Sequence, residues 1–348
     1  MMRSLSFFCV ALLAASNNVS AFLAPPKTGS SSSLKAGFLD QFTKTLSTAA
    51  TTVKSPKVTV PADFVIPEPQ PLTVTEGTDL GKVLKASAAL AVRLATSAFV
   101  LGWEIESVAY QGDGYSLKLG PISLRDRSAV LAQAPRPAQD LILYGYDASP
   151  YCKIVRETLN LLDLTYEYRP CPGARAGQFS QDLKQRTGRQ TVPFLIDPNT
   201  NTEMFESGDI IEYLVATYGP SPDSYDRKAL WPITFTQFAV STATTAAILL
   251  DMPGARRQAN ARPDNEQMQS IEVWAYECSP FCRPVFEKLC ALNLPHKVVS
   301  CSRGSANRDL LFAKTGRFQV PYLVDPNTGI EMYESQAIVD YLEKVYTV

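Results

Sequence analysis

The pattern of apolar and polar residues predicts one series of elements that occurs twice along the chain. Apolar runs at residues 141–146 and 271–276 have the length of buried strands, and each leads into Ser-Pro-aromatic-Cys. Apolar residues at helical spacing follow in both places, at Val155, Leu159 and Leu162 and at Val285, Leu289 and Leu292. Each copy therefore begins with a strand, a tight loop and a helix whose first turn carries a cysteine.

The remainder of each copy alternates in the same way. In the first copy we expect a strand at 166–169, a helix at 179–186 and a strand at 191–196. A turn at 197–200, a return strand at 203–205 and a closing helix at 207–218 follow. The second copy repeats the last four at 319–324, 325–329, 331–333 and 335–346. A mixed α/β fold is predicted for both.

The segments around the copies are less regular. Residues 58–71 are proline-rich and predict a linker, while residues 107–119 predict a hairpin. Residues 80–103 are apolar with helical spacing, but Lys82, Lys85 and Arg93 interrupt them, which favours a packed helix over a membrane span. Residues 229–250 carry no charge, yet their proline, serine and threonine content favours a buried or interfacial helix, so membrane association is not expected. A leading helix before each copy follows from these two segments.

The first residues are typical of a targeting signal. Arg3 precedes an apolar run, and Val19-Ser20-Ala21 supplies the small residues of a cleavage site, which predicts a signal peptide over 1–21. Residues 22–61 are rich in Ser, Thr and Lys, and the whole leader resembles the bipartite plastid leader of algae with red-lineage plastids. We expect the chloroplast stroma, with secretion as the alternative. After the leader, residues 62–138 are predicted to hold a linker, a helix and a hairpin. Residues 139–220 form the first predicted domain, 221–269 a linker helix and 270–348 the second domain.

Composition narrows the function classes. The 348 residues include 33 Lys and Arg against 34 Asp and Glu, so no basic surface predicts a nucleic-acid partner. The chain has 7 cysteines and 1 histidine, and no Cys/His cluster has zinc-ligand spacing, so no metal is expected. His296 lies in an apolar strand-like run, for which we predict a structural or surface role.

The order of elements, with Ser-Pro-aromatic-Cys first and Val-Pro before the third strand, resembles the thioredoxin fold. It is more closely similar to glutaredoxin and to the N-terminal domain of glutathione S-transferases, over 141–219 and 271–346. Paired domains behind such a leader resemble the tandem proteins of this type in plastids and cyanobacteria. The resemblance implies two thioredoxin-like domains in tandem, each preceded by a helical segment, with glutathione as co-substrate and glutathione or a thiol or disulfide as partner. Duplicated domains often pack as an internal pseudo-dimer, which is expected here too.

The resemblance also implies a role for particular residues. Ser149 and Ser279 occupy the place of the attacking cysteine of glutaredoxins. The prolines expected in cis leave the preceding backbone to pair with glutathione's cysteinyl segment, and an acidic-hydroxyl pair at a helix N-terminus holds its γ-glutamyl group. The residues that match these glutathione-binding positions are Val192, Pro193, Glu206, Ser207, Val320, Pro321, Glu334 and Ser335.

The copies depart from a dithiol enzyme at the first motif position. A serine cannot form a mixed disulfide, although it can donate a hydrogen bond to glutathione's sulfur. Cys152 and Cys282 lie one turn deeper, where the neighbouring Lys153 and Arg283 are expected to favour the thiolate. Cys278, next to Ser279, is a candidate nucleophile in the second copy.

Two further cysteines have matching positions. Cys171 and Cys301 each follow the second strand of their copy, 19 residues after the helix cysteine (171 − 152 and 301 − 282). We hypothesise that they resolve or cap the sites, the alternative being small apolar fillers at strand ends.

Two functions fit these residues. One is a glutathione-dependent thiol oxidoreductase or transferase-like enzyme. The other is a non-catalytic plastid module that senses redox state or binds a partner through degenerate sites. Neither copy is followed by the long helical domain that holds the electrophile in transferases, which favours glutathione binding over turnover.

Overall fold

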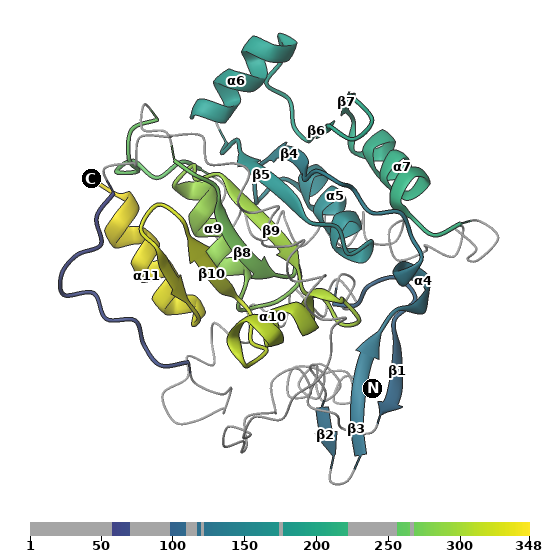
Figure 1. The fold of residues 1–348 in the computed structure, drawn as a ribbon. Helices are drawn as coiled ribbons and strands as arrows, with labels where there is room; N and C mark the ends of the chain where they lie inside the picture. Colours follow the sequence, from purple (N-terminus) through teal and green to yellow (C-terminus); the bar gives the residue numbers. More distant parts are fainter. Residues whose placement is uncertain are drawn as a thin grey trace, which may run out of the picture.

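The computed structural model describes residues 58–69, 98–108, 117–119, 122–173, 177–221, 256–264 and 268–348. Its centre is an eight-stranded sheet with the strand order β11-β10-β8-β9-β5-β4-β6-β7, and a separate three-stranded sheet has the order β1-β3-β2. Both predicted copies contribute to the large sheet, one on each side of the β9–β5 contact (Figure 1).

The first copy follows the predicted order of elements. It comprises β4 (Leu141–Gly145), α5 (Pro150–Leu161), β5 (Tyr166–Pro170), α6 (Gln178–Thr187), β6 (Phe194–Asp197), β7 (Thr202–Phe205) and α7 (Ser207–Tyr218). β4 pairs in parallel with β5 and antiparallel with β6, and β6 pairs antiparallel with β7. The prediction of a thioredoxin-like fold is confirmed for this copy.

The second copy repeats this arrangement. It comprises β8 (Ile271–Ala275), α9 (Arg283–Ala291), β9 (His296–Ser300), α10 (Asn307–Thr315), β10 (Tyr322–Asp325), β11 (Ile330–Met332) and α11 (Ser335–Tyr346). α9 begins three positions later in the motif than α5, because Pro284 has no N–H to donate to the carbonyl of residue 280 and can only stand in a helix's first turn.

The two copies share one sheet through their second strands. β5 and β9 pair antiparallel, with Tyr166 opposite Val298, Glu167 opposite Lys297 and Tyr168 opposite His296. His296 and Val298 occupy the motif positions of Tyr166 and Tyr168, so the pairing is symmetric about Glu167 and Lys297. The copies are thus related by an approximate two-fold rotation at this contact.

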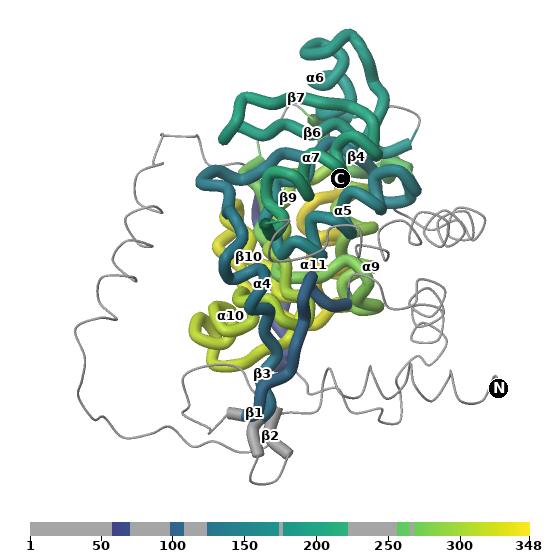
Figure 2. The backbone as a smooth tube through the Cα atoms, turned by 90° about the vertical axis from the view of Figure 1, so that its right-hand side faces the viewer, coloured from purple at the N-terminus to yellow at the C-terminus, as the bar shows by residue number. Residues whose placement is uncertain are grey.

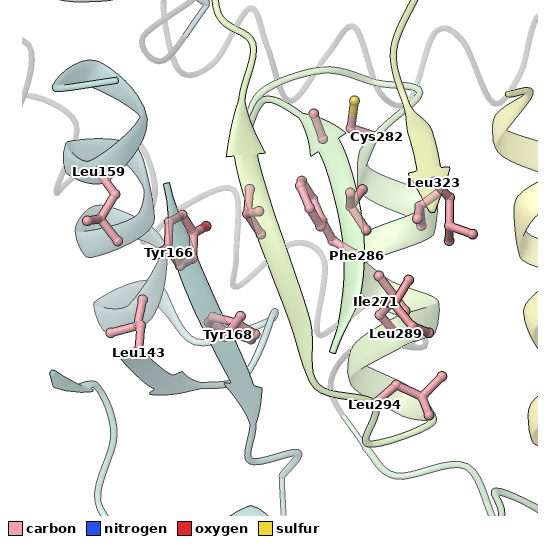
Figure 3. Close-up of a cluster of buried hydrophobic side chains, with 14 of the residues drawn as sticks. Leu143, Leu159, Tyr166, Tyr168, Ile271, Cys282, Phe286, Leu289, Leu294 and Leu323 are labelled. Atoms are coloured by element: carbon pink, nitrogen blue, oxygen red, sulfur yellow. The ribbon is translucent and has the colours of Figure 1, made fainter. Parts of the chain in front are cut away.

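The main hydrophobic core runs across both copies on one face of the sheet. It joins residues such as Leu143, Leu159 and Tyr168 of the first copy to Phe286 and Leu289 of the second (Figure 3). On the other face, α6 and α10 each cover a smaller cluster of their own, which contains Leu183 in one copy and Leu311 in the other.

His296 is buried in β9, and its Nδ1 lies 3.0 Å from the carbonyl oxygen of Leu294. Its ring lies against those of Tyr168 and Phe286. Burial lowers its pKa to about 4, so the ring is neutral at physiological pH. The histidine therefore has a structural place in the contact between the copies.

The N-terminal sheet corrects one prediction. β1 (Glu104–Val108) and β2 (Leu117–Leu119) do not pair with each other as a 107–119 hairpin requires; both pair antiparallel with β3 (Ile122–Arg127). Only residues 120–121 separate β2 from β3, which is the length of a tight hairpin loop, whereas residues 109–116 separate β1 from β2. The prediction of a hairpin at 107–119 was therefore wrong, and the paired neighbouring strands are β2 and β3.

This N-terminal region contacts both copies. The N–H of Val100 donates to Arg303 in the second copy, and the N–H of Leu101 donates to Leu161 in the first. Ser128 caps α4 (Ala129–Ala132), and the sheet lies at the opposite end of the molecule from α6 (Figure 2). Residues 58–69 run beside α11, where the Phe64 ring lies 5.4 Å from that of Tyr341 (Figure 1).

Several predictions lie outside the described residues. They are the leader over 1–57, most of the helix predicted at 80–103 and the uncharged segment 229–250, and with them both leading helices. Within the part of the chain that is described, no helix has the length and apolar content to cross a bilayer.

Candidate functional site

The register of the strands brings the predicted motif residues of each copy to one edge of the sheet. In the first copy Tyr144 lies opposite Phe194, which lies opposite Phe205. The loop after β4, the Val-Pro peptide before β6 and the Glu-Ser pair after β7 therefore meet at that edge. β8, β10 and β11 repeat this arrangement in the second copy.

Each loop serine accepts hydrogen bonds from backbone N–H groups that follow it in the chain; Ser149 is the N-cap of α5, whereas Ser279 lies three residues before Cys282, the N-cap of α9. The Oγ atom of Ser149 accepts from the N–H of Cys152 at 3.3 Å. The Oγ atom of Ser279 accepts from the N–H groups of Phe281 and Cys282, both at 3.3 Å. In the first copy this hydrogen bond fixes the loop to the first turn of α5, and in the second it fixes the turn that precedes α9.

The serines and cysteines of both loops are buried. Ser149 and Cys278 are each 3% exposed, Ser279 is 1% exposed, and Cys152 and Cys282 are 0% exposed. Burial raises the pKa of the Cys152 thiol and raises the pKa of the Cys282 thiol to about 12. The expectation that neighbouring cations favour the thiolates was therefore wrong.

Those cations point away from the sulfurs. Lys153 Nζ lies 3.6 Å from Asp147 and 3.5 Å from Glu277, and Arg283 Nη2 lies 2.6 Å from Glu287. Both stand on the helix face that meets the other copy, where carboxylates are their partners.

Cys171 and Cys301 lie beside the loops, at the ends of β5 and β9. Their N–H groups donate to the carbonyl oxygens of Gly145 at 2.6 Å and Ala275 at 2.9 Å. Both thiols are buried, and burial raises their pKa, to about 12 for Cys171. The cysteines that the structure describes form no disulfide with one another, and a resolving role stays a prediction.

The Val192–Pro193 and Val320–Pro321 peptide bonds are cis, as the resemblance implies. Both prolines are buried, while the valines before them are half-buried.

The Glu-Ser pairs open the closing helices. Glu206 and Glu334 are the N-caps of α7 and α11, with positive φ values of 65° and 70°, and Ser207 and Ser335 are the first residues of these helices. Glu206 is exposed, whereas Glu334 accepts a hydrogen bond from Gln319 Nε2 at 2.7 Å. Free N–H groups at such helix ends attract anions.

The sequence did not reveal a buried group of charges that joins the two loops. Arg156 Nη2 lies 2.8 Å from Asp147 Oδ1 and 2.9 Å from Glu277 Oε1, across the contact between the copies. The available signal was a charged stripe at helical spacing, Lys153, Arg156 and Glu157, which is ordinarily a solvated face. No group of His, Cys, Asp and Glu residues in the described ranges is arranged to hold a metal ion.

Two regions of the chain, residues 143–222 and 274–347, match the family model of the glutathione S-transferase N-terminal domain. No curated protein matches the sequence.

Among solved structures, a glutathione transferase homolog from Drosophila mojavensis is 33% identical over 26% of this chain and 41% of its own, with a TM-score of 0.23. An epsilon-class glutathione S-transferase from the housefly Musca domestica is 30% identical over 26% of this chain and 41% of its own, with a TM-score of 0.23. The trimeric Leishmania glutathione transferase TDR1 is 16% identical over 61% of this chain and 68% of its own, with a TM-score of 0.22.

The chain thus spans about two fifths of the length of the first two of these structures. The fold and the two family matches agree in one respect: two regions of the chain are each similar to the thioredoxin-like N-terminal domain of glutathione S-transferases.

Proposed function

We propose that this protein binds glutathione at two sites, one in each copy. The observation that carries the proposal is the left-handed backbone of Glu206 and Glu334, with φ of 65° and 70°. This conformation costs a residue other than glycine about 1–3 kcal/mol, and such strain gathers at ligand sites. It recurs in both copies at the sheet edge where the loop and the Val-Pro peptide meet, and this location supports a functional reason for it.

The chemistry at these positions suits the γ-glutamyl end of the tripeptide. The first turns of α7 and α11 offer backbone N–H groups and the hydroxyls of Ser207 and Ser335 to a carboxylate. The side chains of Glu206 and Glu334 can accept from the ammonium group. The half-buried backbone at Val192 and Val320 lies at the same edge for the cysteinyl segment.

The buried thiols favour binding without thiol exchange. A thiol with a pKa near 12 is almost wholly protonated at neutral pH, and only a thiolate attacks a disulfide. Cys278 is also buried, which gives a disulfide no access to it in this conformation. These facts support the non-catalytic candidate, a glutathione-sensing or partner-binding module, over an oxidoreductase.

Titration calorimetry with glutathione tests the binding proposal. We expect two sites of full affinity in the unaltered protein, one in Glu206→Ala/Ser207→Ala, one in Glu334→Ala/Ser335→Ala and none in the fourfold variant. Loss of the charge-assisted contacts should weaken binding at the altered site roughly 10- to 100-fold. Glu212→Ala, an exposed glutamate on α7, is the matched control and should bind as before. If the unaltered protein binds no glutathione, or the double variants bind normally, the proposal fails.

Reduction of a small disulfide by glutathione separates capture from exchange. We expect little activity, and no further loss in Cys278→Ser. Substantial turnover that falls in this variant would instead support the oxidoreductase.

We also propose that residues 1–61 direct the protein to the plastid stroma. Their apolar run followed by a Ser-, Thr- and Lys-rich segment supports this destination. A fluorescent protein fused behind residues 1–61 should enter plastids of an alga with secondary plastids; export to the medium would favour secretion.

A further inference from the structure

Both loops end on one buried group of charged side chains, which we call the junction cluster. Its members are Asp147, Lys153 and Arg156 from the first copy and Glu277, Arg283 and Glu287 from the second. The side chains are 2–5% exposed except that of Arg283, at 11%. Charges this deeply buried are tolerated only with partners of opposite charge, so each member depends on the others.

Arg156 is the centre of the junction cluster. Its Nη2 atom lies 2.8 Å from Asp147 Oδ1 and 2.9 Å from Glu277 Oε1, and it also donates to the Asp147 carbonyl oxygen at 3.3 Å. Asp147 precedes Ser149 by two residues, and Glu277 precedes Ser279 by two. The motif position of Arg156 is occupied by Phe286 in the second copy, so one guanidinium serves the acidic residues of both loops.

Each loop is also held by the opposite copy. Arg283 of α9 reaches Asp147 at 3.7 Å, and Lys153 of α5 reaches Glu277 at 3.5 Å. The backbone N–H groups of Asp147 and Glu277 are also bound by the opposite copy. The N–H of Asp147 donates to Cys290 Sγ at 3.4 Å, and the N–H of Glu277 donates to Asn160 Oδ1 at 3.0 Å, from matching positions of the two helices.

We propose that the junction cluster couples the two loops, so that a ligand at one site weakens binding at the other. A ligand that draws Asp147 away from Arg156 leaves the guanidinium to Glu277 alone. In this buried place the remaining pair tightens, because no water replaces the lost partner. The second loop is then held more strongly in its unliganded position. The effect on ligand affinity rests on the proposed binding of glutathione; the coupling of the loops does not.

Stepwise binding of glutathione measures the coupling. We expect the second step in the unaltered protein to be at least fivefold weaker than binding to the same site in the variant whose other site is disabled. Arg156→Met/Glu277→Gln removes one charge of each sign and should make the two steps independent. Glu167→Gln/Arg169→Met makes the same change to an ion pair on β5 and should keep the difference. Equal affinities in the unaltered protein and in the single-site variants would overturn the proposal.

A second measurement needs no ligand and keeps the two proposals apart. Asp147→Asn weakens the hold of Arg156 on the first loop, and we expect backbone amides of residues 276–282 to exchange with solvent at least threefold more slowly. Glu167→Gln should leave them unchanged. If glutathione does not bind, the proposed function fails and amide exchange alone decides the coupling. Second-loop amides that do not respond to Asp147→Asn would overturn it. Should the double variant above not fold, Glu277→Gln alone, which keeps the side-chain shape, replaces it.

Discussion

In the first copy Gly145 ends β4 and Tyr168 lies in β5, whereas the second copy has Ala275 and Val298 at these positions. A Cβ atom on Gly145 would lie 2.7 Å from the Tyr168 hydroxyl and 3.0 Å from Cys152 Sγ, so the glycine makes room for the tyrosine. Arg156 and Phe286 differ in the same region. The copies thus differ where they meet, and the small residue at position 145 is matched by the large one at position 168.

Far from the contact the copies have stayed alike. Asp197 accepts from the hydroxyls of Tyr213 and Tyr218, both at 2.6 Å, and from the N–H of Asn199 at 2.8 Å. Asp325 accepts from Tyr341, Tyr346 and Asn327 at 2.6, 2.7 and 2.8 Å. Both carboxylates are 0% exposed. The two copies therefore share the hydrogen bonds of this turn and differ in the residues at the contact between them.

The largest expected effect comes from this shared turn. Asp197→Ala and Asp325→Ala each remove a buried carboxylate that accepts from two tyrosine hydroxyls and a backbone N–H, so each should lower the free energy of unfolding by about 3–5 kcal/mol. Urea unfolding measures both values. Thr200→Ala removes only the exposed hydrogen bonds of Thr200 to Tyr213 and Thr202 in the same turn and should cost less than about 1 kcal/mol. Costs that differ by more than about 2 kcal/mol would show that the two turns are not equivalent.

The next effect concerns His296, which stands where the first copy has Tyr166. The buried ring stays neutral down to about pH 4, while an exposed histidine takes up a proton below about pH 6.5. The unfolded chain therefore binds the proton first, and the free energy of unfolding should fall by about 3 kcal/mol as the pH drops from 6.5 to 4.

His296→Tyr places the residue of the first copy at this position and should flatten that loss. The chain has no other histidine, which makes the comparison clean. An unchanged pH dependence of urea unfolding in this variant would assign the loss to other groups.

Gly145→Ala should cost about 1–3 kcal/mol, because the new methyl group collides with Tyr168 and Cys152. In a Tyr168→Phe background the closest of these contacts is gone, so the same substitution should cost clearly less. A double-mutant cycle from urea unfolding measures the difference. Additive costs would contradict the matched pair of residues.

The smallest effect is that of Tyr168→Phe alone. The Tyr168 hydroxyl is buried without a hydrogen-bond partner among the described residues. The second copy has the apolar residue Val298 at this position. Removing it should leave stability unchanged or raise it by up to about 1 kcal/mol. A loss above about 1 kcal/mol would mean that the hydroxyl has a partner in solution.

The strand and helix order followed from the sequence because local spacing dictates it. Val155 and Leu159 mark the buried face of α5 by their period, and the closing helices 207–218 and 335–346 were predicted with the observed bounds. Lys153 was misjudged as a cation that favours the Cys152 thiolate, and the burial of Arg156 was not predicted, because charged side chains on a helix face are ordinarily solvated. Only the pairing of β5 with β9, a contact distant in sequence, buries both side chains. The same contact places Cys290 of the second copy against the first loop, where its Sγ accepts from the N–H of Asp147.

The pairing of β5 with β9 has a consequence for any attempt to divide the protein. In a single copy the second strand would be an edge, with unpaired N–H and C=O groups along Tyr166–Pro170 or His296–Ser300. A fragment cut between the copies would expose this edge and the charged side chains that its copy contributes to the junction cluster. Such fragments should associate with themselves or precipitate, so the two copies need to be kept together in any shortened form of the protein.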